Sequence, residues 1–217
     1  MPPTSVTVPI ADRDAMLRRA ASLSDWPILK TKVGFDGDVE IVGAIRDAHG
    51  GRIFIDANEG WTEEQAIERL HAMAELDVDL CEQPIPSGNL EALARVREAS
   101  PIRVFADEDV CTSADVAALS GAVDGVNLKL RKAGGIRELL RAASVARAHG
   151  MGVMIGCDLE SGVAATAGAH IASVADFIDL DGPLLLARDP YPGVSYSAGT
   201  LTLPPGPGLG VERGDLV

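Results

Sequence analysis

The feature that most constrains the fold is a repeat of short apolar runs that alternate with helical segments along the whole 217-residue chain. Eight runs have the β-branched and apolar composition of strands, and they begin at residues 4, 28, 52, 78, 102, 125, 152 and 176. Strands that alternate with helices at a steady interval predict parallel pairing with right-handed crossovers, and eight such units predict a closed barrel. We therefore predict an α/β fold of the TIM type, with residues 1–200 as the barrel domain and residues 201–217 as a tail rich in Pro and Gly.

The helical segments carry their own start signals. Thr62 and Gln65 have the spacing of a capping box, and Ser113 stands where it can cap the next helix. The histidines fall at helix ends or inside helices, where a structural or solvated role is expected, and they are His49, His71, His149 and His170.

Composition and charge narrow the function. A formal net charge of -13 without a basic tract argues against nucleic acid or an anionic membrane surface as a partner. The three cysteines lack CxxC spacing, so neither a disulfide framework nor a thiolate zinc site is expected. No apolar run reaches the roughly 18 residues of a membrane span, and the first residues do not resemble a secretion signal. We expect a cytoplasmic protein.

Charged and amide side chains gather where the predicted strands end. The segment "ILKTKV" sets Lys30 and Lys32 on one face of a strand, because residues spaced i, i+2 point the same way. Successive strand ends lie about 22 to 26 residues apart, the length of one βα unit. The residues at these ends are Lys30, Lys32, Asp56, Asn58, Glu82, Asp107, Glu108 and Lys129. The C-terminal rim of a barrel is where such folds keep their active sites, so these residues predict a catalytic site.

Three of these residues indicate a metal. Asp56, Glu82 and Asp107 would repel one another at one rim unless a cation lay among them. Their hard oxygen ligands, without His or Cys, favour Mg²⁺ over zinc or copper. A single acid at a strand end is more often a turn residue, and a single lysine in a strand is usually solvated. The recurrence of charges on five consecutive strands favours the functional interpretation.

The motifs "LKTKVG", "DANEGW", "CEQP", "ADED" and "NLKLRKAGG" resemble the enolase superfamily, and within it the muconate-lactonizing subgroup. The resemblance is strongest to dipeptide epimerases of the L-Ala-D/L-Glu type and covers nearly the whole chain. It implies a modified (β/α)7β barrel. It also implies that Lys32 and Lys129 are the acid/base pair and that Lys30 tunes Lys32. Asp56, Glu82 and Asp107 would then hold Mg²⁺, with Asn58 and Glu108 in supporting positions.

The chemistry of that subgroup suits these residue types. Removal of a proton alpha to a carboxylate creates an enediolate, whose negative oxygens a divalent cation stabilises. A lysine can act as the base when a neighbouring ammonium and a metal lower its proton affinity. Two lysines on opposite sides of one carbon would remove the proton on one side and return it on the other, which inverts the centre.

The substrate is indicated by residues near the last two strands. The last predicted strand, in "DFIDLDGPLLL", holds Asp179 and Asp181 two residues apart and so on one face. The pair looks like the DxD with which dipeptide epimerases bind an α-ammonium group, although a turn aspartate before Gly182 is the alternative. The segment "GCDLESG" resembles the pocket-lining seventh strand and adds Cys157 and Glu160 to the substrate-binding set; the charge of Asp158 has no assigned role. A cycloisomerase, an o-succinylbenzoate synthase or an N-acylamino acid racemase would use much the same catalytic residues.

The resemblance also implies an N-terminal α+β capping domain, whereas the first predicted strand begins within a few residues of Met1. We therefore expect a barrel that lacks this domain. The function that we expect is epimerisation of a dipeptide, a small-molecule substrate, at the α-carbon of its C-terminal residue. The alternative is a lidless barrel of weak or no activity that needs a partner. The sequence leaves the oligomeric state open, a homo-oligomer included.

Overall fold

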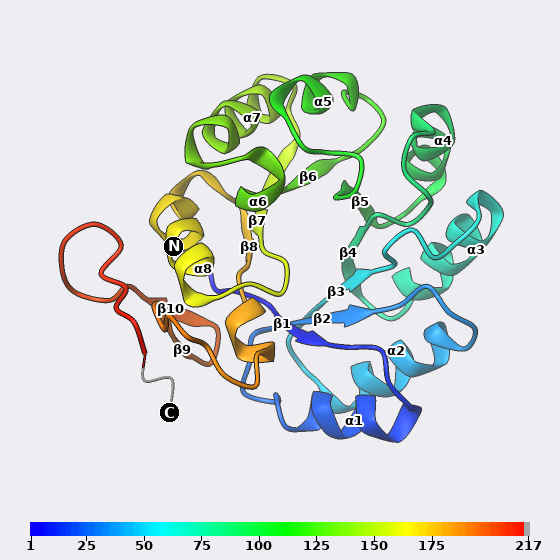
Figure 1. The fold of residues 1–217 in the computed structure, drawn as a ribbon. Helices are drawn as coiled ribbons and strands as arrows, with labels where there is room; N and C mark the ends of the chain where they lie inside the picture. The colour runs from blue at the N-terminus through cyan, green and yellow to red at the C-terminus, as the bar shows by residue number, and fades with distance from the viewer. Residues whose placement is uncertain (215–217) are drawn as a thin grey trace.

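A computed structural model of the protein describes residues 1–214, and its main feature is a ring of strands surrounded by helices (Figure 1). Eight parallel strands pair in the order of the chain. They are β1 (Val6–Val8), β2 (Ile28–Lys32), β3 (Arg52–Asp56), β4 (Val78–Glu82), β5 (Arg103–Ala106), β6 (Gly125–Lys129), β7 (Gly152–Gly156) and β8 (Phe177–Asp179).

The ring closes where the chain's first and last barrel segments meet. Thr4 forms a parallel bridge with Ile178, and the Ser5 amide donates a hydrogen bond of 2.9 Å to the Ile178 carbonyl. This contact completes the circle between β8 and the segment that leads into β1. The TIM-type barrel predicted from the strand repeat is therefore confirmed.

Helices connect successive strands and form the outer layer in Figure 1. They are α1 (Arg13–Ala21), α2 (Asp38–Ala48), α3 (Glu63–Ala74), α4 (Leu90–Ala99), α5 (Ser113–Ala118), α6 (Leu130–Ala133), α7 (Ile136–Ala148) and α8 (Gly162–Ile171). The short α6 and the longer α7 together span the connection from β6 to β7. Within residues 1–214, β8 is followed by a 3-10 turn, η2 (Gly182–Leu185), and not by a crossover helix, as expected of a (β/α)7β barrel. No helix of the described chain has the length and apolar character needed to cross a membrane.

The predicted helix starts are partly correct. Thr62 and Gln65 form the expected capping box at the start of α3. The prediction that Ser113 caps α5 is wrong, because Ser113 is the first helical residue and Thr112 is the N-cap. The Thr112 hydroxyl accepts from the Asp115 amide, while the Asp115 carboxylate accepts from the Thr112 amide. Asp115 completes a capping box with Thr112, and this pairing fixes the helix start one residue earlier.

The barrel interior is divided into an apolar half and a polar half. Inward-facing side chains near the N-terminal ends of the strands form a separate apolar cluster: Ile28, Phe54, Leu80, Phe105, Met154 and Phe177. The Phe177 ring contacts two other phenylalanine rings edge to face, at centroid distances of 5.4 and 5.7 Å. Because inward residues recur with period two, the next residues toward the C-terminal ends are polar, as Phe54 is followed by Asp56 and Ile28 by Lys30. This apolar cluster thus forms the floor of the polar half of the barrel interior.

The alternate residues of the strands face outward and pack under the helices. Leu29, Ile53, Ile55, Val104 and Val153 belong to the larger core cluster, together with helical residues such as Leu70 and Leu93. The sequence places these residues in the core by the same period of two that turns their neighbours inward.

The segment after η2 packs beside the start of the chain and beside α8 (Figure 1). It contains the hairpin β9 (Ser195–Ser197) and β10 (Thr200–Thr202), and the Gly199 carbonyl accepts a 2.8 Å hydrogen bond from the Thr4 amide. The domain boundary predicted between residues 200 and 201 falls inside β10. The rest of the predicted tail is irregular up to residue 214, and residues 215–217 lie outside the described part of the chain.

The close approach of Gly125 to the Phe105 ring allows a test of how tightly the apolar cluster is packed. A Cβ at Gly125 would lie 2.3 Å from Phe105 Cζ, so we expect Gly125→Ala to lower the free energy of unfolding by about 1–3 kcal/mol through overpacking. Chemical denaturation of the two proteins measures this difference. Gly50 is the control, because no atom lies within 4 Å of an added Cβ there, and Gly50→Ala should change stability by under about 1 kcal/mol. Equal effects of the two substitutions would contradict the role assigned to the Phe105 contact.

Candidate active site

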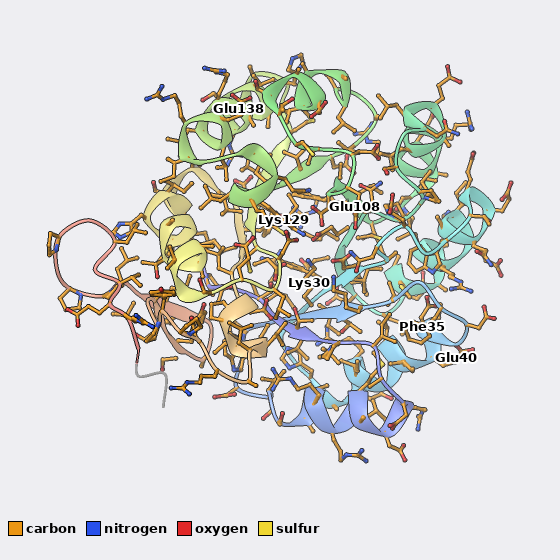
Figure 2. All side chains as sticks on the ribbon, viewed as in Figure 1. Lys30, Phe35, Glu40, Glu108, Lys129 and Glu138 are labelled. Atoms are coloured by element: carbon orange, nitrogen blue, oxygen red, sulfur yellow. The ribbon has the colours of Figure 1, made fainter. Side chains whose placement is uncertain are left out.

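The polar half of the barrel contains a cavity of about 190 Å³ at the C-terminal ends of the strands. Most of the residues predicted for the site line it: Lys30, Lys32, Asn58, Glu108, Lys129, Cys157, Asp179 and Asp181. In Figure 2, Lys30 and Lys129 lie toward the centre of the ring, whereas Glu40 and Glu138 lie among the outer helices. Asp56, Glu82 and Asp107 are almost completely buried, at 0–2% exposure, and do not line the cavity themselves.

Lys30 is the centre of this polar layer. Its ammonium lies 2.7 Å from Asp179, 2.8 Å from Glu82 and 3.0 Å from Asp56, and its side chain is 3% exposed. Burial alone would lower the pKa of Lys30, but the surrounding carboxylates raise it well above its ordinary value. Lys30 is therefore a permanent internal cation that links β2 to β3, β4 and β8.

Lys32 reaches the more open side of the same layer. Its ammonium donates to Asp56 at 2.6 Å and to the Asn58 side-chain oxygen at 2.7 Å, and its side chain is 27% exposed. Asn58 in turn donates to a Glu108 oxygen at 3.0 Å. The predicted pairing of Lys30 and Lys32 on one face is thus correct, and Asn58 and Glu108 form a chain of contacts that orients Lys32.

Lys129 enters the layer from the other side of the ring. Its ammonium donates to Asp107 at 2.6 Å and to Asp158 at 3.2 Å. Lys132 from α6 pairs with the second Asp107 oxygen. Burial alone would raise the pKa of Asp107, but Lys129 and Lys132 hold the pKa of this carboxylate well below its usual value. Burial alone would lower the pKa of Lys129, but Glu82 and Asp107 raise it above its ordinary value. Lys129 is therefore held in its charged form.

Glu82 is the least compensated of the three predicted metal ligands. Burial, then the charge of Asp56, raise its pKa to about 8, although Lys30 acts in the opposite direction. One oxygen accepts a 2.8 Å hydrogen bond from the Asn127 amide, and the other lies near Lys30 Nζ without a hydrogen bond in the described structure. Further positive charge beside this carboxyl group would favour its ionised form.

Asp179 and Asp181 both line the cavity, but only Asp179 belongs to the last strand. Asp179 ends β8 and accepts from Lys30 and from the Ser5 hydroxyl. Asp181 lies beyond the strand, at the start of η2, so its position does not follow from the strand's alternation. Its carboxylate accepts a 2.6 Å hydrogen bond from the Thr7 amide. Burial and the charge of Asp179 raise the pKa of Asp181 to about 6.

The predicted substrate-binding residues that follow β7 lie in two different places. Cys157 and Asp158 line the cavity, and the Cys157 sulfur accepts from the Gly182 amide. Glu160 instead lines a neighbouring, largely apolar groove between the loops that follow β6 and β7. The structure therefore does not bring Glu160 into the cavity with the other predicted substrate-binding residues.

Several polar residues of the layer were not singled out by the sequence. Asn127 lies two residues before Lys129 on β6, a spacing that could have indicated its inward position. Gln83 accepts from the Asp107 amide at 2.9 Å and so fixes the end of β5. Ser5 and Thr7 carry no local signal, because their partners Asp179 and Asp181 lie 174 residues away in the chain.

The donor chemistry at the ends of β3, β4 and β5 fits a hard divalent cation. Asp56, Glu82 and Asp107 are all carboxylates at the ends of adjacent strands, and the Glu82 oxygen that accepts no hydrogen bond in the described structure has only the Lys30 ammonium, 2.8 Å away, as an ion-pair partner there. As they stand, no group of three His, Cys, Asp or Glu side chains among residues 1–214 surrounds a single point. The charges of Lys30, Lys129 and Lys132 hold the carboxylates in this arrangement.

Curated proteins similar to this chain include several epimerases of dipeptides. Over 214 residues the chain is 39% identical to an L-Ala-D/L-Glu epimerase of Bacteroides thetaiotaomicron, covering 98% of this chain and 56% of that protein. It is also 39% identical over 210 residues to a hydrophobic dipeptide epimerase of Roseobacter litoralis, covering 93% of this chain and 61% of the relative. The chain therefore spans a little over half the length of the curated relatives that it matches.

Solved structures show the same fold. The dipeptide epimerase of Cytophaga hutchinsonii, complexed with Mg and the dipeptide D-Ala-L-Val, superposes with a TM-score of 0.92 at 35% identity, covering 99% of this chain and 62% of that structure. A muconate lactonizing enzyme from Pseudomonas fluorescens, complexed with muconolactone, gives a TM-score of 0.91 at 32% identity, with 98% and 62% covered.

The sequence profile of one family matches residues 13–215, nearly the whole chain. The resemblance read from the motifs is thereby confirmed, and the chain belongs to the enolase C-terminal domain-like family.

Proposed function

We propose that this chain is the catalytic barrel of a dipeptide epimerase that inverts the α-carbon of the C-terminal residue. The observation that carries the proposal is the placement of Lys32 and Lys129 around one cavity. Their strands, β2 and β6, are four positions apart in a ring of eight, so the two lysines approach from opposite sides. A carbon held between them can lose a proton to one lysine and receive a proton from the other.

Asp179 and Asp181 favour a dipeptide over other carboxylate substrates. Both are 3% exposed and lie at the cavity, and Asp181 has no ion pair within the described chain. An α-ammonium group would supply the missing positive charge, whereas an anionic substituent would be repelled. The relatives named above act on L-Ala-D/L-Glu and on hydrophobic dipeptides, which supports this substrate class.

We further propose that Asp56, Glu82 and Asp107 hold Mg²⁺. When bound, the metal would supply positive charge beside the substrate carboxylate, which stabilises the negative charge that develops as the α-proton leaves. The chain's own residues place the two lysines: Asp56 and Asn58 orient the Lys32 ammonium, and Asp107 orients that of Lys129. Lys30 keeps the carboxylates together.

A muconate-lactonizing type of reaction is the second candidate. The superposition on a muconate lactonizing enzyme supports it, because the barrel and its lysines suit both reactions. A barrel that turns over substrate only when a further segment covers the cavity is the other alternative, since the chain spans only part of its relatives.

The first test is exchange of the substrate's α-proton. With Mg²⁺ and a panel of L,L-dipeptides in heavy water, we expect the α-proton signal of the C-terminal residue to disappear from the NMR spectrum. Lys32→Ala and Lys129→Ala should each slow epimerisation by at least about 100-fold, because each removes one proton carrier.

Arg95→Ala is the control, because it removes a positive charge that pairs with Glu63 on the outer helices, away from the cavity. It should retain exchange at one tenth of the wild-type rate or more. Absence of exchange with every dipeptide, in a folded protein that binds Mg²⁺, would contradict the epimerase proposal. Lactonisation of a muconate would then support the second candidate.

A second prediction links Mg²⁺ to pH through Glu82. Its pKa is about 8 in the fold against 4.5 for an ordinary glutamate, so between these values the folded chain holds a proton that the unfolded chain has released. The free energy of unfolding without metal should therefore fall as pH rises from 6.5 to 8, by up to about 1.4 kcal/mol per pH unit. Because Mg²⁺ requires the ionised carboxylate, its stabilising effect should be larger at pH 8 than at pH 6.5.

Denaturation curves in EDTA and in excess Mg²⁺ at the two pH values measure both effects. Glu82→Gln mimics the protonated side chain, so it should flatten the pH dependence and weaken the response to Mg²⁺. A variant whose pH dependence equals that of the wild-type protein would show that Glu82 is not the titrating group.

A further inference from the structure

We propose that Asp158 is a positioning residue for Lys129, which it holds at the cavity independently of Asp107. This inference rests on the proposed function, in which Lys129 is one of the two proton carriers. It concerns the charge in "GCDLESG" that the sequence motifs leave without a role.

The contacts form a short chain of charges. The Lys129 ammonium lies 3.2 Å from one Asp158 oxygen, and the guanidinium of Arg131 binds the other oxygen. Burial would raise the pKa of Asp158, but Lys129 and Arg131 hold it below its usual range. Because its charge is already shared between two cations of this chain, Asp158 is poorly suited to bind a cationic group of the substrate.

The backbone at Asp158 is fixed against the neighbouring strand. The Cys157 amide donates to the Asp179 carbonyl at 3.0 Å, and the Gly182 amide donates to the Cys157 sulfur at 3.2 Å. A Cβ on Gly182 would lie 2.3 Å from the Asp158 carbonyl oxygen. The absence of a side chain at Gly182 thus allows the loops after β7 and β8 to touch, which sets where the Asp158 carboxylate points.

Lys129 needs Asp158 as a second anionic partner, because its first partner, Asp107, is also a proposed metal ligand. Asp107 pairs with both Lys129 and Lys132, and it is one of the three proposed metal ligands. A bound cation would draw on the charge of Asp107 and weaken its hold on Lys129. Asp158 is not in the ligand set, so its contact with Lys129 persists when the metal is bound.

The experiment measures α-proton exchange in heavy water separately from each epimer of one dipeptide. Each lysine faces one side of the α-carbon, so Lys32→Met and Lys129→Met identify which epimer depends on which lysine. Asp158→Ala should slow exchange from the epimer that depends on Lys129 by about 10- to 100-fold, the effect of a misplaced catalytic group. Exchange from the other epimer should change by less than about threefold. Asp158→Asn keeps an oxygen acceptor and should lose less of the Lys129-dependent rate than Asp158→Ala.

Asp79 provides a matched control. It is 25% exposed, against 28% for Asp158, and it pairs with Arg52 and Arg103 near the N-terminal ends of the strands. Asp79→Ala should leave the ratio of the two exchange rates unchanged. Equal slowing from both epimers in Asp158→Ala would overturn the positioning role, because a loss of general stability acts on both directions alike.

A second measurement does not depend on turnover. Acetic anhydride labelling followed by mass spectrometry reports how freely each lysine reacts, and Asp158→Ala should raise labelling of Lys129 severalfold relative to Lys30. Unchanged labelling of Lys129 would overturn the inference. If the wild-type protein exchanges no dipeptide, the proposed function fails, and the labelling result alone then decides whether Asp158 holds Lys129.

Discussion

The ammonium of Lys30, held between carboxylates of three other strands, is the interaction on which the polar half of the barrel depends. Asp56, Glu82 and Asp179 all lie within 3.0 Å of it, and each is almost fully buried. Three buried carboxylates without a cation would protonate or separate, and removal of one partner from such a pair typically costs 3–5 kcal/mol. Lys30 therefore allows a cluster of acids to exist inside the barrel before any substrate or metal arrives.

The position of this cluster follows from the alternation of each strand. The same face that carries Ile28 and Phe54 near the N-terminal ends carries Lys30 and Asp56 one step later. The apolar floor excludes water from below, so charges above it interact in a less polar medium than water. The fold thus provides two lysines on opposite strands, acids between them and a cavity at the C-terminal ends of the strands.

Much of this arrangement could be predicted from the sequence. The strand repeat predicted the barrel and its order, and the ends of the strands predicted the residues that line the cavity, because both depend on local periodicity. Residues that meet only through closure of the ring could not be predicted in this way. Ser5 contacts Asp179 because β8 lies beside the first segment, and nothing near Ser5 in the sequence indicates that partner.

Two positions differ from the expected ones for physical reasons of the same kind. Asp181 was assigned to a strand, but β8 ends at Asp179 and the chain turns into η2. Glu160 was expected at the substrate because "GCDLESG" resembles a pocket-lining segment, whereas it lines the adjacent groove, just before α8. Both residues lie past the last strand residue, where the alternation that predicts direction no longer applies.

The most direct measurement is a crystal structure of this chain with Mg²⁺ and an L,L-dipeptide. The proposed function predicts the α-carbon of the C-terminal residue between the Lys32 and Lys129 ammonium groups, the metal on Asp56, Glu82 and Asp107, and the α-ammonium group at Asp179 and Asp181. A dipeptide bound with that carbon out of reach of either lysine, or a metal bound elsewhere, would contradict it.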